Sequence, residues 1–273
     1  MAKEFRAGFS FSDDRTQIVV AEFRDDGSDI KYVEELTRNS ELAFYVLPPS
    51  VFTALKPFGK ISKIGVSIET DRAMVQTYPM DASLSPSEQE EQIDWEWKNF
   101  VPDYSSNEFL QQTRILKSDT EEQTNIVLST IIKHSLLNEI KSFFSSNNLQ
   151  YDSLELHPAT SERVLRFVHP DIKEKTVALI CISHLRLDVL VLENGTLTTY
   201  KYGIGLQPKT AVEFLANELL EVLPEVLYVF GSALSHEWMK AMKSSLGVVV
   251  PLNPFRKFRL ALDVKHFSRF LGH

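Results

Sequence analysis

A pattern of strand, turn, strand, turn with glycine, strand and helix occurs twice in this chain of 273 residues. The first copy starts near residue 4, and its glycine turn is Asp25-Asp26-Gly27. The second copy covers residues 176–223, with Asn194-Gly195 at the corresponding turn. Glycine at these places supplies the positive φ that tight hairpins require. Because strands and helices continue to alternate after each copy, we predict two α/β units, each with a mainly parallel or mixed sheet.

The segment between the two copies has a helix and strand pattern of its own. Ser85 and Glu88 form a capping box around Pro86, and apolar residues follow at helical spacing. Two paired strands and a second helix are then expected in "NEFLQQTRIL", "NIVLSTIIK" and "SLLNEIKSFFSSNN". We therefore predict a small α+β subdomain at about residues 80–150, inserted in a first domain of residues 1–160, with a second domain of residues 161–273.

The composition excludes several classes of partner and site. The formal net charge of −8 argues against a broad nucleic-acid or anionic-membrane surface, since such surfaces need clustered Lys and Arg. The single cysteine, Cys181, allows neither a disulfide nor a Cys-based zinc site within one chain. No secretory signal begins the sequence, and no window approaches the roughly 18 apolar residues that span a bilayer. We expect a cytoplasmic protein that meets the inner membrane only through a partner.

Three short stretches carry a resemblance to a known family. They are "VVAEF" at residues 19–23, "EEQIDWEWKNFVPDYSSNEFLQQTRIL" at residues 90–116, and "GVVVPLNPF", which closes in Asn253-Pro254-Phe255. With them, the order of elements resembles the actin-like fold of actin, the large heat-shock chaperones and the sugar kinases. Within that superfamily the chain most resembles the PilM-like proteins of type IV pilus assembly, and less closely FtsA and the cytoplasmic domain of GspL. The resemblance implies an α/β fold of two actin-like domains, built from duplicated RNase H-like units.

The residues at the family's nucleotide site depart from the family pattern. Members hold ATP and magnesium with two turns that contain Asp and Gly, and with a third Gly-Gly turn beside the base. Here the first turn falls on Ser10-Phe11-Ser12 and the second on Cys181-Ile182-Ser183, and neither contains an Asp or a Gly. A neutral thiol cannot replace a carboxylate as a magnesium ligand. We therefore expect no ATP hydrolysis, no bound cofactor and no metal site.

A nucleotide that still bound in this crevice would have to contact the residues at these turns and at the glycines beyond them. Those candidate contacts are Ser10, Ser12, Ser183, Gly205, Gly231 and Ser232.

The resemblance also implies a protein partner. In PilM-like proteins, a short cytoplasmic segment of a membrane-anchored PilN-like protein is held in a groove between the first subdomain and the insert, by main-chain pairing at a sheet edge. The candidate lining residues here are Trp95, Trp97, Phe100 and Phe109. Trp95 and Trp97 cannot share one face of a helix, so one of them is expected in the core. The predicted function is a non-catalytic scaffold of a type IV pilus or type II secretion-like assembly platform.

Two alternatives remain open. An active actin-like ATPase or small-molecule kinase with atypical phosphate loops would need a carboxylate in the crevice, such as Asp13 or Asp188. A protein with this fold and no pilus link is the other alternative. Asp13 and Asp14 favour a solvated hairpin loop over a cation site. The alternating His184, Arg186 and Asp188 favour a partly exposed polar sheet face with one ion pair over a catalytic cluster. No nucleophile elbow, zinc-protease helix or P-loop occurs in the sequence.

Overall fold

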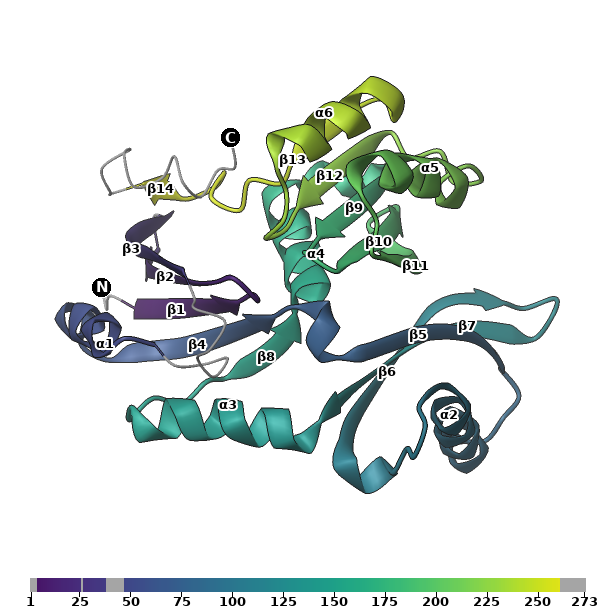
Figure 1. The fold of residues 1–273 in the computed structure, drawn as a ribbon, viewed down its shortest axis with the longest axis horizontal. Helices are drawn as coiled ribbons and strands as arrows, with labels where there is room; N and C mark the ends of the chain where they lie inside the picture. The colour runs from purple at the N-terminus through teal and green to yellow at the C-terminus, as the bar shows by residue number, and fades with distance from the viewer. Residues whose placement is uncertain (1–3, 26, 38–46, 261–273) are drawn as a thin grey trace.

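The computed structural model describes residues 4–25, 27–37 and 47–260, and its strands form three sheets (Figure 1). The first sheet has six strands in the order β14-β3-β2-β1-β4-β8. They are β1 (Glu4–Phe11), β2 (Arg15–Arg24), β3 (Gly27–Thr37), β4 (Ile61–Ile68), β8 (Ser153–Leu156) and β14 (Arg259–Leu260). The first three strands form the predicted antiparallel meander, whereas β4 and β8 add to it in parallel.

The second sheet repeats this arrangement with five strands in the order β11-β10-β9-β12-β13. They are β9 (Thr176–Ile182), β10 (Arg186–Glu193), β11 (Thr196–Ile204), β12 (Val226–Phe230) and β13 (Val249–Pro251). Again the first three are antiparallel and the last two add in parallel. Apart from β14 at the edge of the first sheet, the two sheets have the same strand order, which confirms the predicted duplication. Strands β9 and β10 are buried along almost their whole length, as their continuous apolar sequences predict for strands covered on both faces.

Helices cover the sheets through apolar residues at helical spacing. The first core includes Val51 of α1 (Pro49–Leu55) and Phe144 of α3 (His134–Ser146). On one face of the second sheet lie α5 (Pro208–Glu218) and α6 (His236–Ser245), and on the other lies α4 (His157–Val168). Four 3-10 turns complete the helical elements of the described residues: η1 (Lys56–Phe58), η2 (Thr70–Arg72), η3 (Ser106–Glu108) and η4 (Pro170–Glu174). The sequence of residues 40–59 predicts a partly helical stretch, and its residues 40–46 lie outside the described residues.

The third sheet belongs to the insert and has the order β5-β7-β6. Its strands are β5 (Met74–Asp81), β6 (Phe109–Asp119) and β7 (Thr124–Lys133). Helix α2 (Pro86–Phe100) covers one face, and its predicted capping box between Ser85 and Glu88 is present. On the other face, Val75 and Leu116 pack into the core that the insert shares with the second sheet. The insert therefore touches both halves of the molecule.

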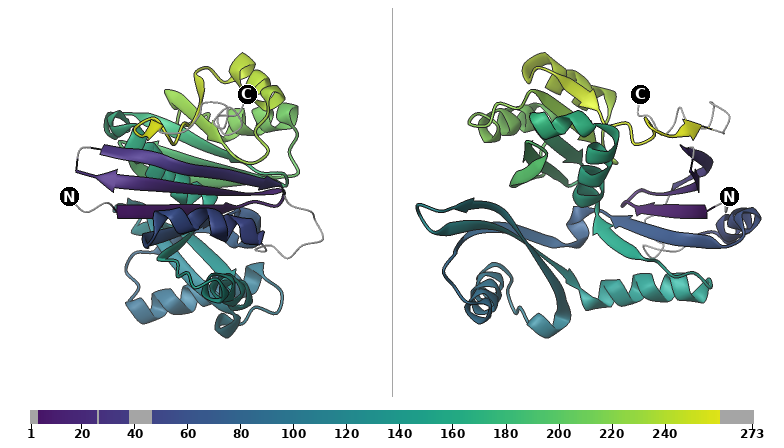
Figure 2. Two further views of the ribbon diagram at one scale, coloured as in Figure 1. Left: turned by 90° about the vertical axis from the view of Figure 1, so that its left-hand side faces the viewer. Right: turned by 180° about the vertical axis from the view of Figure 1, so that it is seen from behind.

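The second unit and the insert lie one above the other, and the first sheet lies to one side of both, as Figure 1 and the right view of Figure 2 show. We call the part built on the first sheet, with the insert, the first lobe, and the part built on the second sheet the second lobe. The predicted domain boundary at residue 160 falls within α4. The predicted second domain includes β14, but this strand pairs with β3 of the first sheet, so the chain crosses back between the lobes near its end.

Candidate functional site

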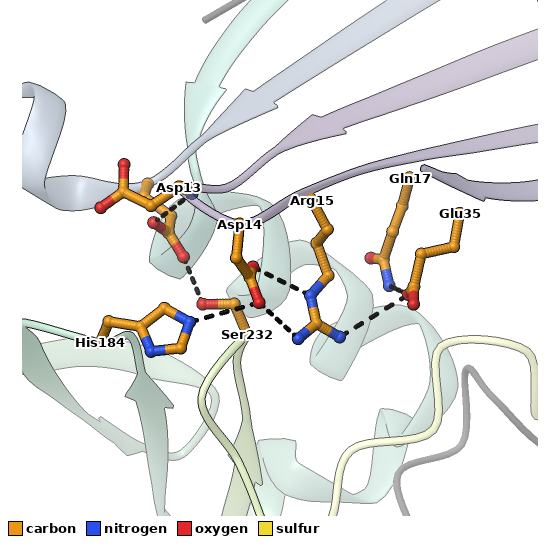
Figure 3. Close-up of polar contacts among 8 residues, drawn as sticks. Asp13, Asp14, Arg15, Gln17, Glu35, His184 and Ser232 are labelled. Carbon is orange, nitrogen blue, oxygen red and sulfur yellow. Dashed lines mark hydrogen bonds and ion pairs between the residues drawn. The ribbon is translucent and has the colours of Figure 1, made fainter. Parts of the chain in front are cut away.

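Three turns from the two lobes meet at the crevice between them (Figure 3). The β1–β2 turn is closed by the backbone N–H of Ser12, which donates to the carbonyl of Arg15 at 2.9 Å. The equivalent β9–β10 turn is closed in the same way, from Ser183 to Arg186, also at 2.9 Å. The third turn follows β12 at Gly231. The sequence pattern thus places the turns correctly, because each ends a strand at the same edge of its sheet.

Side chains of the protein itself bridge the crevice. The Ser232 hydroxyl donates to a carboxylate oxygen of Glu69 in the opposite lobe. His184 Nε2 lies 3.3 Å from Asp14 Oδ2, and Arg15 holds the same Asp14 oxygen at 2.7 Å. Figure 3 shows His184 of the second lobe in contact with Asp14 of the β1–β2 turn. We refer to the pairs Ser232–Glu69 and His184–Asp14 as the crevice contacts.

An acidic cluster lies beside the crevice contacts. The carboxylates of Asp13, Glu69 and Asp71 lie within 4.8 Å of one another, which is close enough to share a cation. Burial raises the pKa of Glu69. Burial, together with the Asp13 carboxylate, raises the pKa of Asp71 to about 7, so Asp71 is partly protonated at neutral pH. Arg72 offsets some of the negative charge through its ion pair with Asp13 at 2.5 Å.

Sequence reasoning missed the residues that follow β4. Glu69 accepts a hydrogen bond from the backbone N–H of Asp13 at 3.1 Å, although 56 positions separate the two residues. One signal was available: "ETDR" directly follows a buried strand, and polar residues at the carboxyl ends of parallel strands gather at one edge of a sheet. Because β4 is parallel to β1 and adjacent to it, its end lies beside the first turn.

The serines proposed for nucleotide contacts are engaged within the protein. Ser10 Oγ lies 3.1 Å from Nε2 of His157, whose pKa burial lowers to about 4. Ser183 Oγ donates to the Arg186 carbonyl of its own turn at 2.9 Å. Ser12 is buried, and Ser232 forms one of the crevice contacts.

The two glycines proposed for nucleotide contacts differ from each other. Gly205 has a φ of +66°, and a Cβ built there would meet no atom within 4 Å. Gly231 has a φ of +130°, and a Cβ there would lie 2.1 Å from the carbonyl oxygen of Ile182. Glycine is therefore required at position 231 by the close approach of two backbones.

The alternating residues His184, Arg186 and Asp188, of the β9–β10 turn and the start of β10, do not form one cluster. His184 joins Asp14 in the crevice, whereas Arg186 and Asp188 form a buried ion pair at 2.7 Å with Asp188 only 1% exposed. The Tyr200 hydroxyl donates to Asp188 and accepts from Arg186. The expected ion pair is present, but the expected partial exposure of this face is wrong, because α4 and the insert cover it.

A cavity of about 590 Å³ lies where the insert, α4 and the second sheet meet. Its apolar walls come from the insert (Leu128, Ile132), from β8 (Leu154, Leu156) and from the second lobe (Leu190). Such a mixture of apolar walls and a few polar groups is typical of binding cavities. The sequence could not locate this cavity, since its walls come from segments far apart along the chain.

The charged side chains of the cavity wall are paired. Glu162 lies between Arg114 at 2.9 Å and Arg166 at 2.6 Å, and Arg163 pairs with Glu155 at 2.6 Å. Burial favours the neutral form of Glu162, but the two arginines hold the pKa of this carboxyl below its usual value. Three arginines and two carboxylates thus line the cavity, and its wall has one positive charge in excess.

The four aromatic residues proposed for partner binding do not line this cavity. Trp97 of α2 is fully buried against the insert sheet, where its Nε1 donates to Ser129 Oγ at 2.9 Å. Phe109 is buried in the same core. These two residues cannot contact a partner, because they form the core of the insert. Trp95 and Phe100 are 60% and 47% exposed on α2, away from the cavity lining.

Among the residues that the structure describes, no helix is both long and apolar enough to cross a bilayer.

Comparisons with known proteins show what this arrangement resembles. No family model and no curated protein sequence matches the chain. A chain of a PilM-PilN type IV pilus biogenesis complex superposes with a TM-score of 0.68 at 14% identity, covering 97% of this chain and 93% of that one. A Bacteroides thetaiotaomicron protein of unknown function with the actin-like ATPase fold has a TM-score of 0.57 at 13% identity, covering 98% and 95%.

A third solved structure is similar over almost its whole length. The cytoplasmic domain of EpsL, an inner membrane component of the type II secretion system of Vibrio cholerae, has a TM-score of 0.51 at 7% identity, covering 98% of this chain and 94% of that one. At such identities the likeness is one of fold. The chain therefore has the α/β actin-like ATPase fold, as the duplicated strand pattern and the resemblance to PilM-like proteins predict.

Proposed function

We propose that this chain is a non-catalytic scaffold of a type IV pilus or type II secretion-like assembly platform. In this proposal it docks an extended cytoplasmic segment of a membrane-anchored PilN-like protein, and so lies at the inner membrane through that partner. The main observation behind the proposal is the cavity between the insert, α4 and the second sheet. Its volume, its apolar walls and its place beside the insert suit a short peptide, and the most similar fold reported above belongs to a PilM-PilN complex.

The edge of the insert sheet supplies a second feature that suits a peptide. Among the described strands, β6 pairs only with β7, and β11 approaches β6 without pairing with it, so β6 has backbone groups left for main-chain pairing. Leu110 of β6 is 51% exposed and lies opposite Ile132, which lines the cavity. An extended segment along β6 would therefore reach apolar side chains at the cavity while pairing its backbone with the strand.

The experiment that tests docking fills the cavity. Ala159 is an exposed residue of α4 that lines it, so an Ala159→Trp side chain would occupy the space of the segment. We expect affinity for a synthetic peptide from the cytoplasmic segment of a PilN-like protein to fall at least about tenfold by calorimetry, a loss of about 1.4 kcal/mol. Ala216→Trp, on the exposed side of α5, is the matched control and should bind as the wild type does. Equal binding by both variants would contradict the proposal.

The crevice contacts support the absence of turnover, since protein side chains already bridge the lobes there. The acidic cluster of Asp13, Glu69 and Asp71 is the one observation that favours the rival function, an active ATPase or kinase. A thermal unfolding scan with millimolar Mg-ATP separates the two. We expect no measurable shift of the midpoint. A native-state ligand at a hundredfold excess over Kd adds about 2.7 kcal/mol, so a clear rise would favour the rival.

A further inference from the structure

Two arginines of the cavity wall share one carboxylate. Arg114 of β6 donates to Glu162 from both of its terminal nitrogens, at 2.9 and 3.1 Å, and Arg166, one turn further along α4, donates to it from Nη2 at 2.6 Å. Glu162 is only 5% exposed, and burial favours its neutral form, but the two arginines hold its pKa below the usual value. Glu162 is therefore ionised at neutral pH, and the three side chains together carry one positive charge in excess.

The excess charge is accessible and is not neutralised elsewhere in the cavity wall. Arg163 and Glu155, the other charged residues of the wall, pair with each other at 2.6 Å. Arg114 and Arg166 both line the cavity, and their side chains are 44% and 39% exposed. A ligand in the cavity can therefore reach both guanidinium groups.

Both guanidinium groups have donors left. A guanidinium has five N–H groups in a planar fork that matches a carboxylate. Glu162 takes two of these from Arg114 and two from Arg166, so three of each remain in the described part of the chain. Because Glu162 already holds both side chains in place, a second carboxylate would bind them with little loss of side-chain entropy.

The position of Arg114 on β6 sets how far the charge lies from the apolar contact at Leu110. Arg114 lies opposite Leu128 of β7, and Leu110 lies opposite Ile132, and both of these β7 residues line the cavity. Residues an even number apart on a strand share one face, and four residues span about 13 Å. A segment paired along β6 would therefore present an apolar residue and an acidic one about four positions apart.

We propose that the docked segment carries an acidic side chain, which forms an ion pair with Arg166 and Arg114 at the cavity. The inference rests on the proposed docking function and adds to it the charge of the segment and a specificity-determining residue, Arg166. Apolar walls hold the other side chains of the segment, and the arginines select the acidic one.

The test is a substitution scan of a synthetic peptide from the cytoplasmic segment of a PilN-like protein. Each residue is replaced in turn by Asp and by Asn, and calorimetry gives the two Kd values. Since the chain has a net charge of −8, a carboxylate should weaken binding at most positions. We expect one position at which the Asp peptide binds about fivefold more tightly than the Asn peptide, as for a partly exposed ion pair. This preference should shrink at high salt.

Arg166→Gln removes the excess charge and leaves the paired contact of Arg114 with Glu162 in place. We expect this variant to lose the preference for Asp at that position and to bind the Asn peptide as the wild type does. An arginine with only a structural role would, on removal, weaken both peptides equally. Arg166→Lys keeps a charge and should keep part of the preference.

Lys117→Gln is the matched control. Lys117 is an exposed residue of β6 that does not line the cavity, and its replacement changes the net charge by the same amount as Arg166→Gln. We expect this variant to keep the full preference for Asp. The scan of the wild-type protein needs no variant, so it can contradict the inference even if Arg166→Gln folds poorly.

The outcomes separate this inference from the function on which it rests. Absence of binding of every peptide by the wild-type protein would overturn the docking function and the arginine site together. Binding without a preference for Asp at any position would overturn the arginine site alone, and so would a preference that Arg166→Gln retains. A preference at one position that Arg166→Gln loses and Lys117→Gln keeps supports both.

Discussion

Replacing Gly231 by alanine is expected to destabilise the protein by about 3–5 kcal/mol, through backbone strain and a steric clash together. Its φ of +130° is a conformation that residues with a Cβ rarely adopt, and the new Cβ would lie 2.1 Å from the Ile182 carbonyl oxygen. Neither β9 nor the turn can move away easily, since Ile182 also accepts from the backbone N–H of Ala233 at 3.1 Å. Thermal or denaturant unfolding of the purified Gly231→Ala variant measures the loss.

Gly205 provides the control for this prediction. It also has a positive φ, +66°, but a Cβ there would meet nothing within 4 Å. Gly205→Ala should therefore cost only the backbone strain of a left-handed residue, about 1–2 kcal/mol. Similar losses for the two variants would mean that the clash at Ile182 is relieved by movement. Both glycines were also candidates for nucleotide contacts.

The free energy of unfolding should depend on pH through Asp71. Its pKa is raised from the usual 3.8 to about 7, so between about pH 4 and 7 the folded protein binds more protons at this site than the unfolded chain does. The contribution of Asp71 to the free energy of unfolding therefore falls as the pH rises from about 4 to about 7. Relative to the wild type, Asp71→Asn should be equally stable near pH 4 and more stable near pH 8, by about 1–2 kcal/mol after allowance for its partial exposure.

The wild-type pH profile alone does not isolate this effect. His157 has a pKa lowered to about 4 by burial, so the unfolded chain binds more protons there, and stability rises with pH up to about 6.5. The difference between Asp71→Asn and the wild type removes this opposite contribution. As a control, Asp171→Asn should show a difference of the opposite sign, because Lys175 lowers the pKa of Asp171. Parallel profiles for Asp71→Asn and the wild type would show that Asp71 ionises normally.

Local patterns predicted most of the fold. The alternating apolar residues, the glycine turns and the capping box at Ser85 each act within a few residues, so they can be recognised without knowledge of the tertiary structure. The return of β14 to β3 was not predicted, because a two-residue strand carries no periodic signal of its own. The insert was recognised as a separate unit for the same local reasons.

The candidate sites were less accessible to sequence reasoning. The turns of the crevice were located correctly, but the contact between Glu69 and Ser232 was not predicted. These two residues are 163 positions apart and meet only when both lobes are folded. Trp97 and Phe109 were named because the resemblance places the partner groove at the insert, yet α2 and its sheet bury both in their own small core. One of the two tryptophans was expected in the core, and it is Trp97.

The sequence by itself determined the two repeated units, the insert between them and the departure of both phosphate turns from the family pattern, because each depends on residue types at short spacing. Only the tertiary structure decided that the crevice is bridged by side chains of the protein, that Gly231 is needed for a close approach to Ile182, and that a cavity lies beside the insert. These features arise where segments from both lobes and the insert meet, and burial, pairing and pKa at such places depend on neighbours that are remote along the chain.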